Sequence, residues 1–205
     1  MHGERATATR RALIDATAAR LATSDESELR IADVCEDTGY SSSVIYSNFR
    51  SRQGLIDAAL LAMFDQRSRD YIDLLRHYTH HAQTREELFS FYAVPEKLER
   101  ITETLTELRQ IRLRVSTAAL ARPDLRREWQ PVQEAHVERF AELIEAAQAR
   151  GLLGRALSSR EIVALFEALS FGRALDAVSL RPLSDRSWLS MLLLVVDGLE
   201  AQRGG

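Results

Sequence analysis

The chain has 205 residues, of which 45% are hydrophobic and 28% charged, and its formal net charge is −3. This composition is typical of a soluble globular protein, and it excludes a disordered chain and a strongly basic protein that coats nucleic acid. The lone Cys35 excludes an internal disulfide framework and a cysteine-based zinc site. The N-terminus has no uninterrupted apolar stretch, and the longest apolar run, 191–196, is too short to span a membrane. We therefore expect a cytoplasmic protein.

Amphipathic periodicity predicts helices along almost the whole chain, and no segment shows the alternation of a strand. The expected helices are 5–23, 28–37, 41–48, a longer one from Arg52, 67–82, 85–93, 96–121, 123–150, one from Ser158 to about 180, and 185–202. Ser27 and Ser51 are suited to cap two of the early helices. Thr84 with Glu87, and Ser158 with Glu161, have the spacing of capping boxes.

Residues 29–55, LRIADVCEDTGYSSSVIYSNFRSRQGL, predict a helix, a glycine turn, a short helix, a turn and a third helix. Two helices joined by a tight turn with Gly39 form a helix-turn-helix unit, whose second helix enters the major groove of DNA. That second helix has a polar leading edge of serines at 41–43, and Tyr46 and Asn48 follow it. Their hydroxyl and amide groups can bond to phosphates or base edges. Arg52, in the first turn of the next helix, can hold a phosphate.

This segment resembles the DNA-binding domain of the TetR/AcrR family of transcriptional regulators. The positions that match the family pattern in order and spacing are Val34, Gly39, Ser41, Ile45, Tyr46, Phe49, Arg52 and Leu55. The departures are Thr38 where Ala is usual, Ser42 where a basic residue is frequent, Ser43 where Gly is common and Arg52 where Lys is usual. Because of these departures, the resemblance does not predict which DNA sequence the operator has. The resemblance implies an all-α fold, with a three-helix DNA-binding domain at 1–52 and a helical bundle for ligand binding and dimerisation at 53–205.

The function implied by the resemblance is that of a dimeric repressor that a small-molecule ligand releases from a palindromic operator on double-stranded DNA. A protein with this function requires no cofactor and is not an enzyme. The sequence agrees, because it contains no Gly-rich phosphate loop, nucleophile elbow or paired metal-ligand motif. The resemblance implies that positions 40, 42 and 43 face the groove and that positions 46, 48 and 52 face phosphates. The full set of implied DNA contacts is Arg10, Tyr40, Ser41, Ser42, Ser43, Tyr46, Asn48 and Arg52. The alternative is a helical binding protein that uses its N-terminal bundle for protein contact and has negligible affinity for DNA.

The last two predicted helices are apolar on more than one face, which indicates burial on two sides. TetR-like regulators dimerise through their last two helices as a four-helix bundle, and the resemblance implies the same arrangement here. The alternative is that both helices lie in a monomeric core. The residues expected at the interface are Phe166, Leu169, Gly172, Arg173, Leu192, Val195, Val196 and Leu199.

Two polar residues in the middle of apolar helix faces indicate a ligand site. They are Arg112 in the helix 96–121 and His136 in the helix that follows. A buried Arg or His needs a partner. These residues therefore either orient a polar or anionic group of an otherwise apolar ligand, or bond internally, for example to Glu145 or Glu167. The candidate ligand-binding residues are Phe64, Tyr71, Leu108, Arg112, Trp129, His136, Phe140 and Phe171.

Three histidines, His77, His80 and His81, lie at helical spacing and two of them could share a metal ion. No carboxylate or cysteine joins them in the sequence, so we expect a solvated helix end and no metal site. Cys35 is expected to be a small buried residue rather than a redox switch.

Overall fold

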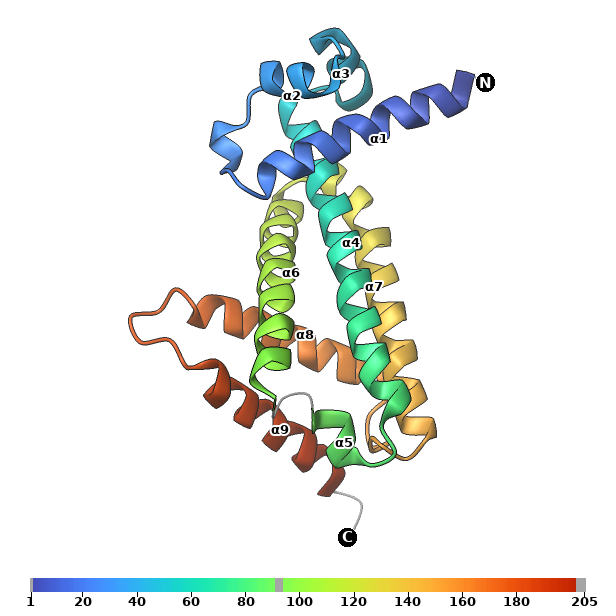
Figure 1. Ribbon diagram of the computed structural model, residues 1–205, viewed down its shortest axis with the longest axis vertical. Helices are drawn as coiled ribbons and strands as arrows, with labels where there is room; N and C mark the ends of the chain where they lie inside the picture. The colour runs from blue at the N-terminus through green and yellow to red at the C-terminus, as the bar shows by residue number, and fades with distance from the viewer. Residues whose placement is uncertain (1, 91–93, 202–205) are drawn as a thin grey trace.

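The computed structural model describes residues 2–90 and 94–201, and the side chains of residues 5–90, 94, 96–97, 99 and 101–198. Every regular element in these ranges is helical, so the predicted all-α fold is confirmed. The elements are α1 (His2–Leu21), the 3-10 turn η1 (Glu26–Glu28), α2 (Ile31–Thr38), α3 (Ser42–Phe49), α4 (Arg52–His81), α5 (Arg85–Phe89), α6 (Pro95–Ala121), α7 (Pro123–Ala149), α8 (Ser159–Asp176) and α9 (Asp185–Ala201). Figure 1 shows a small head made of α1 to α3 above an elongated body.

The head packs three short apolar helix faces together. Leu13 of α1, Val34 of α2 and Ile45 of α3 are fully buried and share one core. The chain turns between α2 and α3 at Gly39, whose φ of 72° lies in the left-handed region that favours glycine. The predicted helix-turn-helix arrangement is therefore present, with Gly39 ending its first helix.

The connection between α1 and α2 differs from the prediction. Ser27 does not cap α2, because Asp25 accepts hydrogen bonds from the backbone N–H of Ser27 at 2.8 Å and from its hydroxyl at 2.9 Å. This local bond closes the separate turn η1, and α2 begins only at Ile31. An Asp side chain competes in this way with helix formation by bonding to the backbone two residues on.

The helix predicted over 67–82 is not separate, because α4 runs unbroken for 30 residues from Arg52 to His81. No Gly or Pro interrupts the sequence between 55 and 81. Ser51 caps the helix as predicted, since its hydroxyl accepts the N–H of Gly54 at 3.0 Å. At 1.5 Å per residue, α4 is about 45 Å long. It therefore passes from the head to the far end of the body (Figure 1).

The body is completed by α6 and α7 beside α4, while α8 and α9 project to one side (Figure 1). The capping box of α8 is confirmed, because the Ser158 hydroxyl accepts the N–H of Glu161 and the Glu161 carboxylate accepts the N–H of Ser158. The box at α5 is only half formed, since the Glu87 carboxylate accepts instead from the N–H of Gln83 at 2.6 Å. No helix among the described residues combines the length and the hydropathy that crossing a membrane requires.

Candidate DNA-binding surface and ligand pocket

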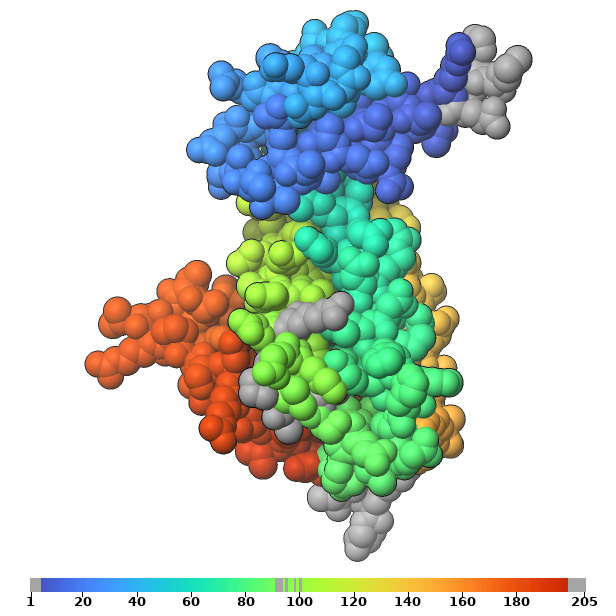
Figure 2. All heavy atoms as spheres, in the orientation of Figure 1, coloured from blue at the N-terminus to red at the C-terminus, as the bar shows by residue number. Residues whose placement is uncertain are grey.

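The helix α3 buries one face and exposes a polar one. Ile45 and Phe49 lie in the core, whereas Ser42, Ser43 and Tyr46 are exposed, and Tyr46 retains 48% of its accessible surface. Ser41 stands at the N-cap position with an exposed hydroxyl 2.8 Å from that of Ser43. The predicted polar leading edge is thus presented to solvent on the outside of the head. Figure 2 shows this head as a separate lobe on top of the body.

Three other residues predicted to contact DNA lie around α3. Arg10 is exposed on α1, and its guanidinium lies 5.0 Å from the ring centroid of Phe49. Tyr40 is half-buried and its hydroxyl accepts a hydrogen bond from Thr9 at 3.3 Å. Asn48 is half-buried and donates its amide to the carbonyl of Val44 at 2.8 Å. The structure therefore gathers residues from α1 and α3 on one lobe.

Arg52 has an internal partner that the sequence did not reveal. Its Nε donates to the carbonyl of Leu29 at 2.7 Å, and its Nη2 donates to the carbonyl of Glu26. The side chain is only partly exposed. It fastens the start of α4 to the connection between α1 and α2, so it sets the position of the helix-turn-helix on α4.

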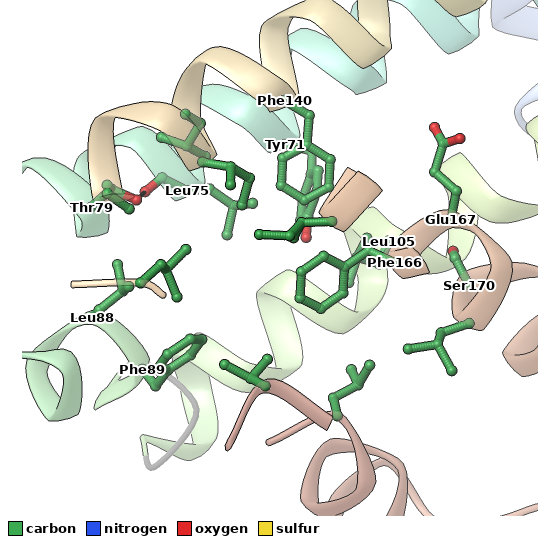
Figure 3. Close-up of a pocket in the computed structure, with 18 of the residues that line it drawn as sticks. Tyr71, Leu75, Thr79, Leu88, Phe89, Leu105, Phe140, Phe166, Glu167 and Ser170 are labelled. Atoms are coloured by element: carbon green, nitrogen blue, oxygen red, sulfur yellow. Dashed lines mark hydrogen bonds between the residues drawn. The ribbon is translucent and has the colours of Figure 1, made fainter. Parts of the chain in front are cut away.

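The body contains a cavity of about 160 Å³ between α4, α5, α6, α7, α8 and α9. Figure 3 shows its mostly apolar side chains pointing toward one another from several helices. Five of the predicted ligand-binding residues line this cavity, namely Tyr71, Leu108, Arg112, His136 and Phe140. We call it the body pocket.

The other three predicted ligand residues lie behind the pocket wall. The rings of Phe64 and Trp129 meet edge to face at 4.7 Å, and Phe64 contacts the ring of His136 at 5.4 Å. Phe171 lies under the guanidinium of Arg112 at 5.4 Å. These aromatic side chains support the polar residues of the pocket and do not form its surface.

Arg112 and His136 have internal partners, which is one of the two alternatives that the sequence left open, and they also line the body pocket. Arg112 forms an ion pair with Glu167 of α8, and all three residues line the body pocket. The Nε2 atom of His136 lies 3.6 Å from the Glu167 carboxylate, and its Nδ1 atom lies 2.7 Å from the hydroxyl of Ser68. Glu145, the other acid considered, accepts instead from the hydroxyl of Ser159 at 2.7 Å.

Burial keeps His136 neutral. The side chain is almost inaccessible to water, and desolvation lowers its pKa to about 3, with further lowering by the positive charges of Arg112 and Arg139. The imidazole is therefore uncharged near neutral pH and has one N–H donor and one acceptor nitrogen. It can orient a polar ligand group but carries no charge of its own.

Several residues of the pocket wall were not among the predicted ligand contacts. Phe166, Leu169, Leu192 and Val196, which are expected at a dimer interface, also line the pocket. Leu88 and Phe89 of α5 close one end, and their only sequence signal is a short apolar pair after a capped turn. A helix that is apolar all round does not reveal which of its faces lines a cavity and which meets a partner.

The remaining residues expected at the interface lie between or beside the last two helices. Gly172 lies against Trp188, since a Cβ added there would stand 3.7 Å from that ring. Arg173 forms ion pairs with Asp176 at 2.8 Å and with Asp185 at 2.7 Å. Val195 is half-buried, and the side chain of Leu199 lies outside the described residues. The large apolar side chains that face solvent on or between α8 and α9 are Leu175, Val178, Leu180, Leu183, Met191 and Leu194.

The histidines at the end of α4 are exposed, with the rings of His77 and His81 4.7 Å apart. Among the described residues, no group of three or more potential metal ligands gathers here or elsewhere. Cys35 is half-buried on α2, somewhat more open than expected.

Comparison with solved structures matches the fold over nearly the whole chain. A TetR-family transcriptional regulator from Rhodococcus sp. is 26% identical, with a TM-score of 0.61, over 93% of this chain and 97% of that one. The TM-score rises to 0.67 for a TetR-family regulator from Mesorhizobium loti, which is 16% identical over 95% of this chain and 96% of that one. The chain thus has the fold of TetR-family transcriptional regulators. No protein-family sequence profile and no curated protein sequence matches it.

This likeness extends over both the head and the body, because each match covers more than nine tenths of the chain. The Rhodococcus and Mesorhizobium proteins are transcriptional regulators, which supports the DNA-binding regulator expected from the sequence. A transcriptional regulator from Saccharomonospora viridis, solved in complex with choline, has the same fold, with 18% identity, a TM-score of 0.59 and coverage of 93% of this chain and 96% of that one. At that identity the likeness concerns the fold alone.

Proposed function

We propose that this protein is a TetR-like dimeric repressor, which binds a palindromic operator through α3 and leaves it when a small molecule occupies the body pocket. The observation that carries the proposal is the path of α4. Its first residue, Arg52, is bonded to the head, and its later residues Tyr71, Leu75 and Thr79 line the pocket. A ligand that displaces these side chains moves an element on which the head rests.

A second helix makes a similar connection. Leu105, Leu108 and Arg112 of α6 line the pocket, and Arg114 of the same helix pairs with Glu26 of η1 at 3.3 Å. Both helices thus contact the pocket and the DNA-binding head. To move occupancy of the operator from 1:99 to 99:1, a ligand must favour the non-binding state by about 10⁴-fold.

On the DNA side, the proposed groove-facing residues are Tyr40, Ser42 and Ser43, with Ser41 at the start of the helix. Tyr46, Asn48 and Arg10 are proposed phosphate contacts. The exposure of Tyr46 and Arg10 supports this assignment. Arg52 can reach a phosphate only with donors that its bonds to the α1–α2 connection leave available. A cytoplasmic location is part of the proposal, because a regulator acts where the DNA is.

The proposed dimer uses the outer face of α8 and α9. Leu175 is 62% exposed and Leu194 is 69% exposed, although both are large and apolar. Apolar residues gathered on one face mark a protein interaction site more often than isolated ones do. Two copies joined there by a two-fold axis would present two α3 helices to a symmetric site, which requires half-sites about 34 Å apart.

Fluorescence anisotropy on the DNA upstream of its own gene tests the DNA-binding part. We expect tight binding that scrambled DNA does not show, and its loss in Tyr46→Ala. Tyr46→Phe separates the hydroxyl from the ring. Arg10→Ala should weaken binding and reduce the slope of log K against log salt by about one. Arg76→Ala is the matched control, because that exposed arginine lies far along α4.

Failure on the upstream DNA is followed by selection from random sequences. If the selection also yields no binding site, the proposal is wrong and a helical protein-binding role replaces it.

Sedimentation of Leu194→Glu tests the dimer. A charge at this exposed apolar position should produce monomers, because an unpaired charge is costly to bury in an interface. Leu120→Glu is the matched control, since Leu120 is 76% exposed at the end of α6, away from α8 and α9. A dimer that survives Leu194→Glu unchanged would contradict this interface.

A further inference from the structure

The polar end of the body pocket combines Arg112 of α6, His136 of α7 and Glu167 of α8. Arg112 is 8% exposed and His136 is 3% exposed, so both lie almost entirely within the protein. Buried polar atoms are normally paired. The buried polar atoms that lack a partner therefore indicate which ligand group this end of the pocket can accept.

Glu167 has little capacity left for a ligand. Its carboxylate forms the ion pair with Arg112 and accepts the side-chain amide of Gln133 at 3.2 Å and 3.4 Å, one contact to each oxygen. The Nε2 atom of His136 lies 3.6 Å away. A cationic ligand would have to displace the guanidinium of Arg112 before it could use this acid, and would leave that guanidinium buried and unpaired.

Arg112, in contrast to Glu167, has a donor that is available to a ligand. Its Nε atom is buried, and no acceptor for it exists among the described residues. The guanidinium is otherwise held by Glu167 on one side and by the ring of Phe171, 5.4 Å away, on the other. A buried donor without an acceptor is unfavourable, so an oxygen that shares this guanidinium with Glu167 or takes it over would relieve the deficit. Arg109, one turn earlier on α6, adds a second guanidinium to the same wall.

The titration of His136 agrees with a positive environment. After burial, the largest causes of its low pKa, about 3, are the charges of Arg112 and Arg139. The imidazole is neutral, and so it adds no positive charge that Glu167 would be needed to balance. The pocket therefore has a guanidinium with one unpaired donor and a carboxylate that already has two partners.

The rest of the pocket is apolar. In Figure 3, Glu167 and Ser170 lie toward one end, Leu88 and Phe89 toward the other, and aromatic rings stand between them. The rings of Phe140 and Phe166 are stacked with centroids 6.1 Å apart. The volume is about 160 Å³, and an apolar cavity of about 150 Å³ holds benzene.

We infer that the body pocket takes a small amphipathic carboxylate, whose acid group binds Arg112 in competition with Glu167 and whose apolar body of roughly six carbons lies against Phe140 and Phe166. The inference rests on the proposed function, because it names the ligand class of the same pocket.

Isothermal titration calorimetry of the full chain, without DNA, compares three probes of equal chain length. They are hexanoate, hexan-1-ol and hexyltrimethylammonium. We expect hexanoate to bind at least about tenfold more tightly than the alcohol, because it makes a charge-assisted hydrogen bond, and the ammonium compound to bind more weakly still. Equal or tighter binding of the alcohol or the ammonium compound overturns the inference, and so does the absence of binding by all three.

Glu167→Gln separates an anion site from a cation site. It removes the competing carboxylate and retains Arg112, so hexanoate should bind more tightly than to the unchanged protein. A cation site predicts the reverse, namely loss of hexyltrimethylammonium binding. The control is Glu142→Gln, which changes an exposed carboxylate on α7 and should alter neither affinity.

A double substitution tests the role of Arg112 without leaving an unpaired buried charge that could prevent folding. Arg112→Met with Glu167→Met removes both charges at similar volume, a change that buried ion pairs often tolerate. The folded double variant should bind hexanoate and hexan-1-ol with similar affinity, and a retained preference for hexanoate contradicts the assigned role of Arg112. Parallel anisotropy measurements separate the two proposals. Hexanoate binding by a protein without DNA affinity refutes the repressor alone, whereas DNA binding with preference for the ammonium probe refutes the carboxylate alone.

Discussion

Arg122, at the junction of α6 and α7, holds a buried carboxylate on α4. Its guanidinium donates two hydrogen bonds to Asp57, one of them at 3.0 Å, and the Asp57 side chain is 8% exposed. The bonded carboxylate raises the pKa of Arg122. In Arg122→Ala, the hydrogen bond that remains to the Asp57 carboxylate among the described residues comes from the amide of Gln53 at 3.1 Å. Unpairing a buried charge costs about 3–5 kcal/mol, and since Arg122 is itself 39% exposed, we expect about 2–3 kcal/mol.

Urea unfolding followed by circular dichroism measures this loss, and a thermal scan should show a fall of roughly 4–12 °C for a chain of this size. The matched control is Arg127→Ala, because Arg127 pairs with Asp124 on the surface, where the two side chains are 77% and 82% exposed. It should cost less than about 0.5 kcal/mol. The double variant Asp57→Asn with Arg122→Ala should be more stable than Arg122→Ala alone, because no unpaired charge remains. A double variant no more stable than the single one would refute the reasoning.

Three further predictions concern stability. Because the pKa of His136 is about 3 in the folded protein and about 6.5 unfolded, the unfolded chain binds the proton first as pH falls. This residue should therefore remove about 2 kcal/mol of stability between pH 7 and pH 5, and urea titrations of His136→Gln should lack that part of the decrease. In Gly54→Ala the new Cβ would overlap the backbone carbonyl of Phe49, so we expect a loss of about 1–3 kcal/mol by thermal denaturation. Gly198→Ala, with open space around it, should instead gain up to about 1 kcal/mol, and similar shifts for both would contradict the steric explanation. Ser158→Ala should cost about 1 kcal/mol in urea unfolding through loss of the α8 cap, and an unchanged midpoint would count against that cap.

Local features of the sequence predicted the head well. Gly39 and Ser51 mark backbone conformations that depend on one or two neighbouring residues, and both act as expected. The failure at Ser27 has a local cause too, since Asp25 competes for the same backbone. The helix periodicity that placed Arg112 and His136 on inward faces was also correct, because one helix turn suffices to define a face.

Features that depend on the packing of several helices could not be predicted from the sequence. Arg52 reaches the carbonyl of Leu29, which is 23 residues away, and no local pattern encodes that bond. Phe64 and Phe140 are both buried aromatic residues, yet only Phe140 lines the pocket. Which buried ring lines the pocket depends on how α4, α7 and α8 pack against one another, and hydrophobic periodicity contains no information on that packing.

The last helix, α9, has one face toward the body pocket and another toward solvent. Trp188, Leu192 and Val196 lie on the pocket side, while Met191 and Leu194 face solvent where the proposed partner would pack. If copies associate through that outer face and a ligand shifts α9, ligand occupancy and self-association are thermodynamically coupled, and each changes the equilibrium constant of the other by the same factor. The apparent ligand affinity then depends on protein concentration near the dissociation constant of the dimer. A dilute protein and a concentrated one would therefore respond to different amounts of the same effector.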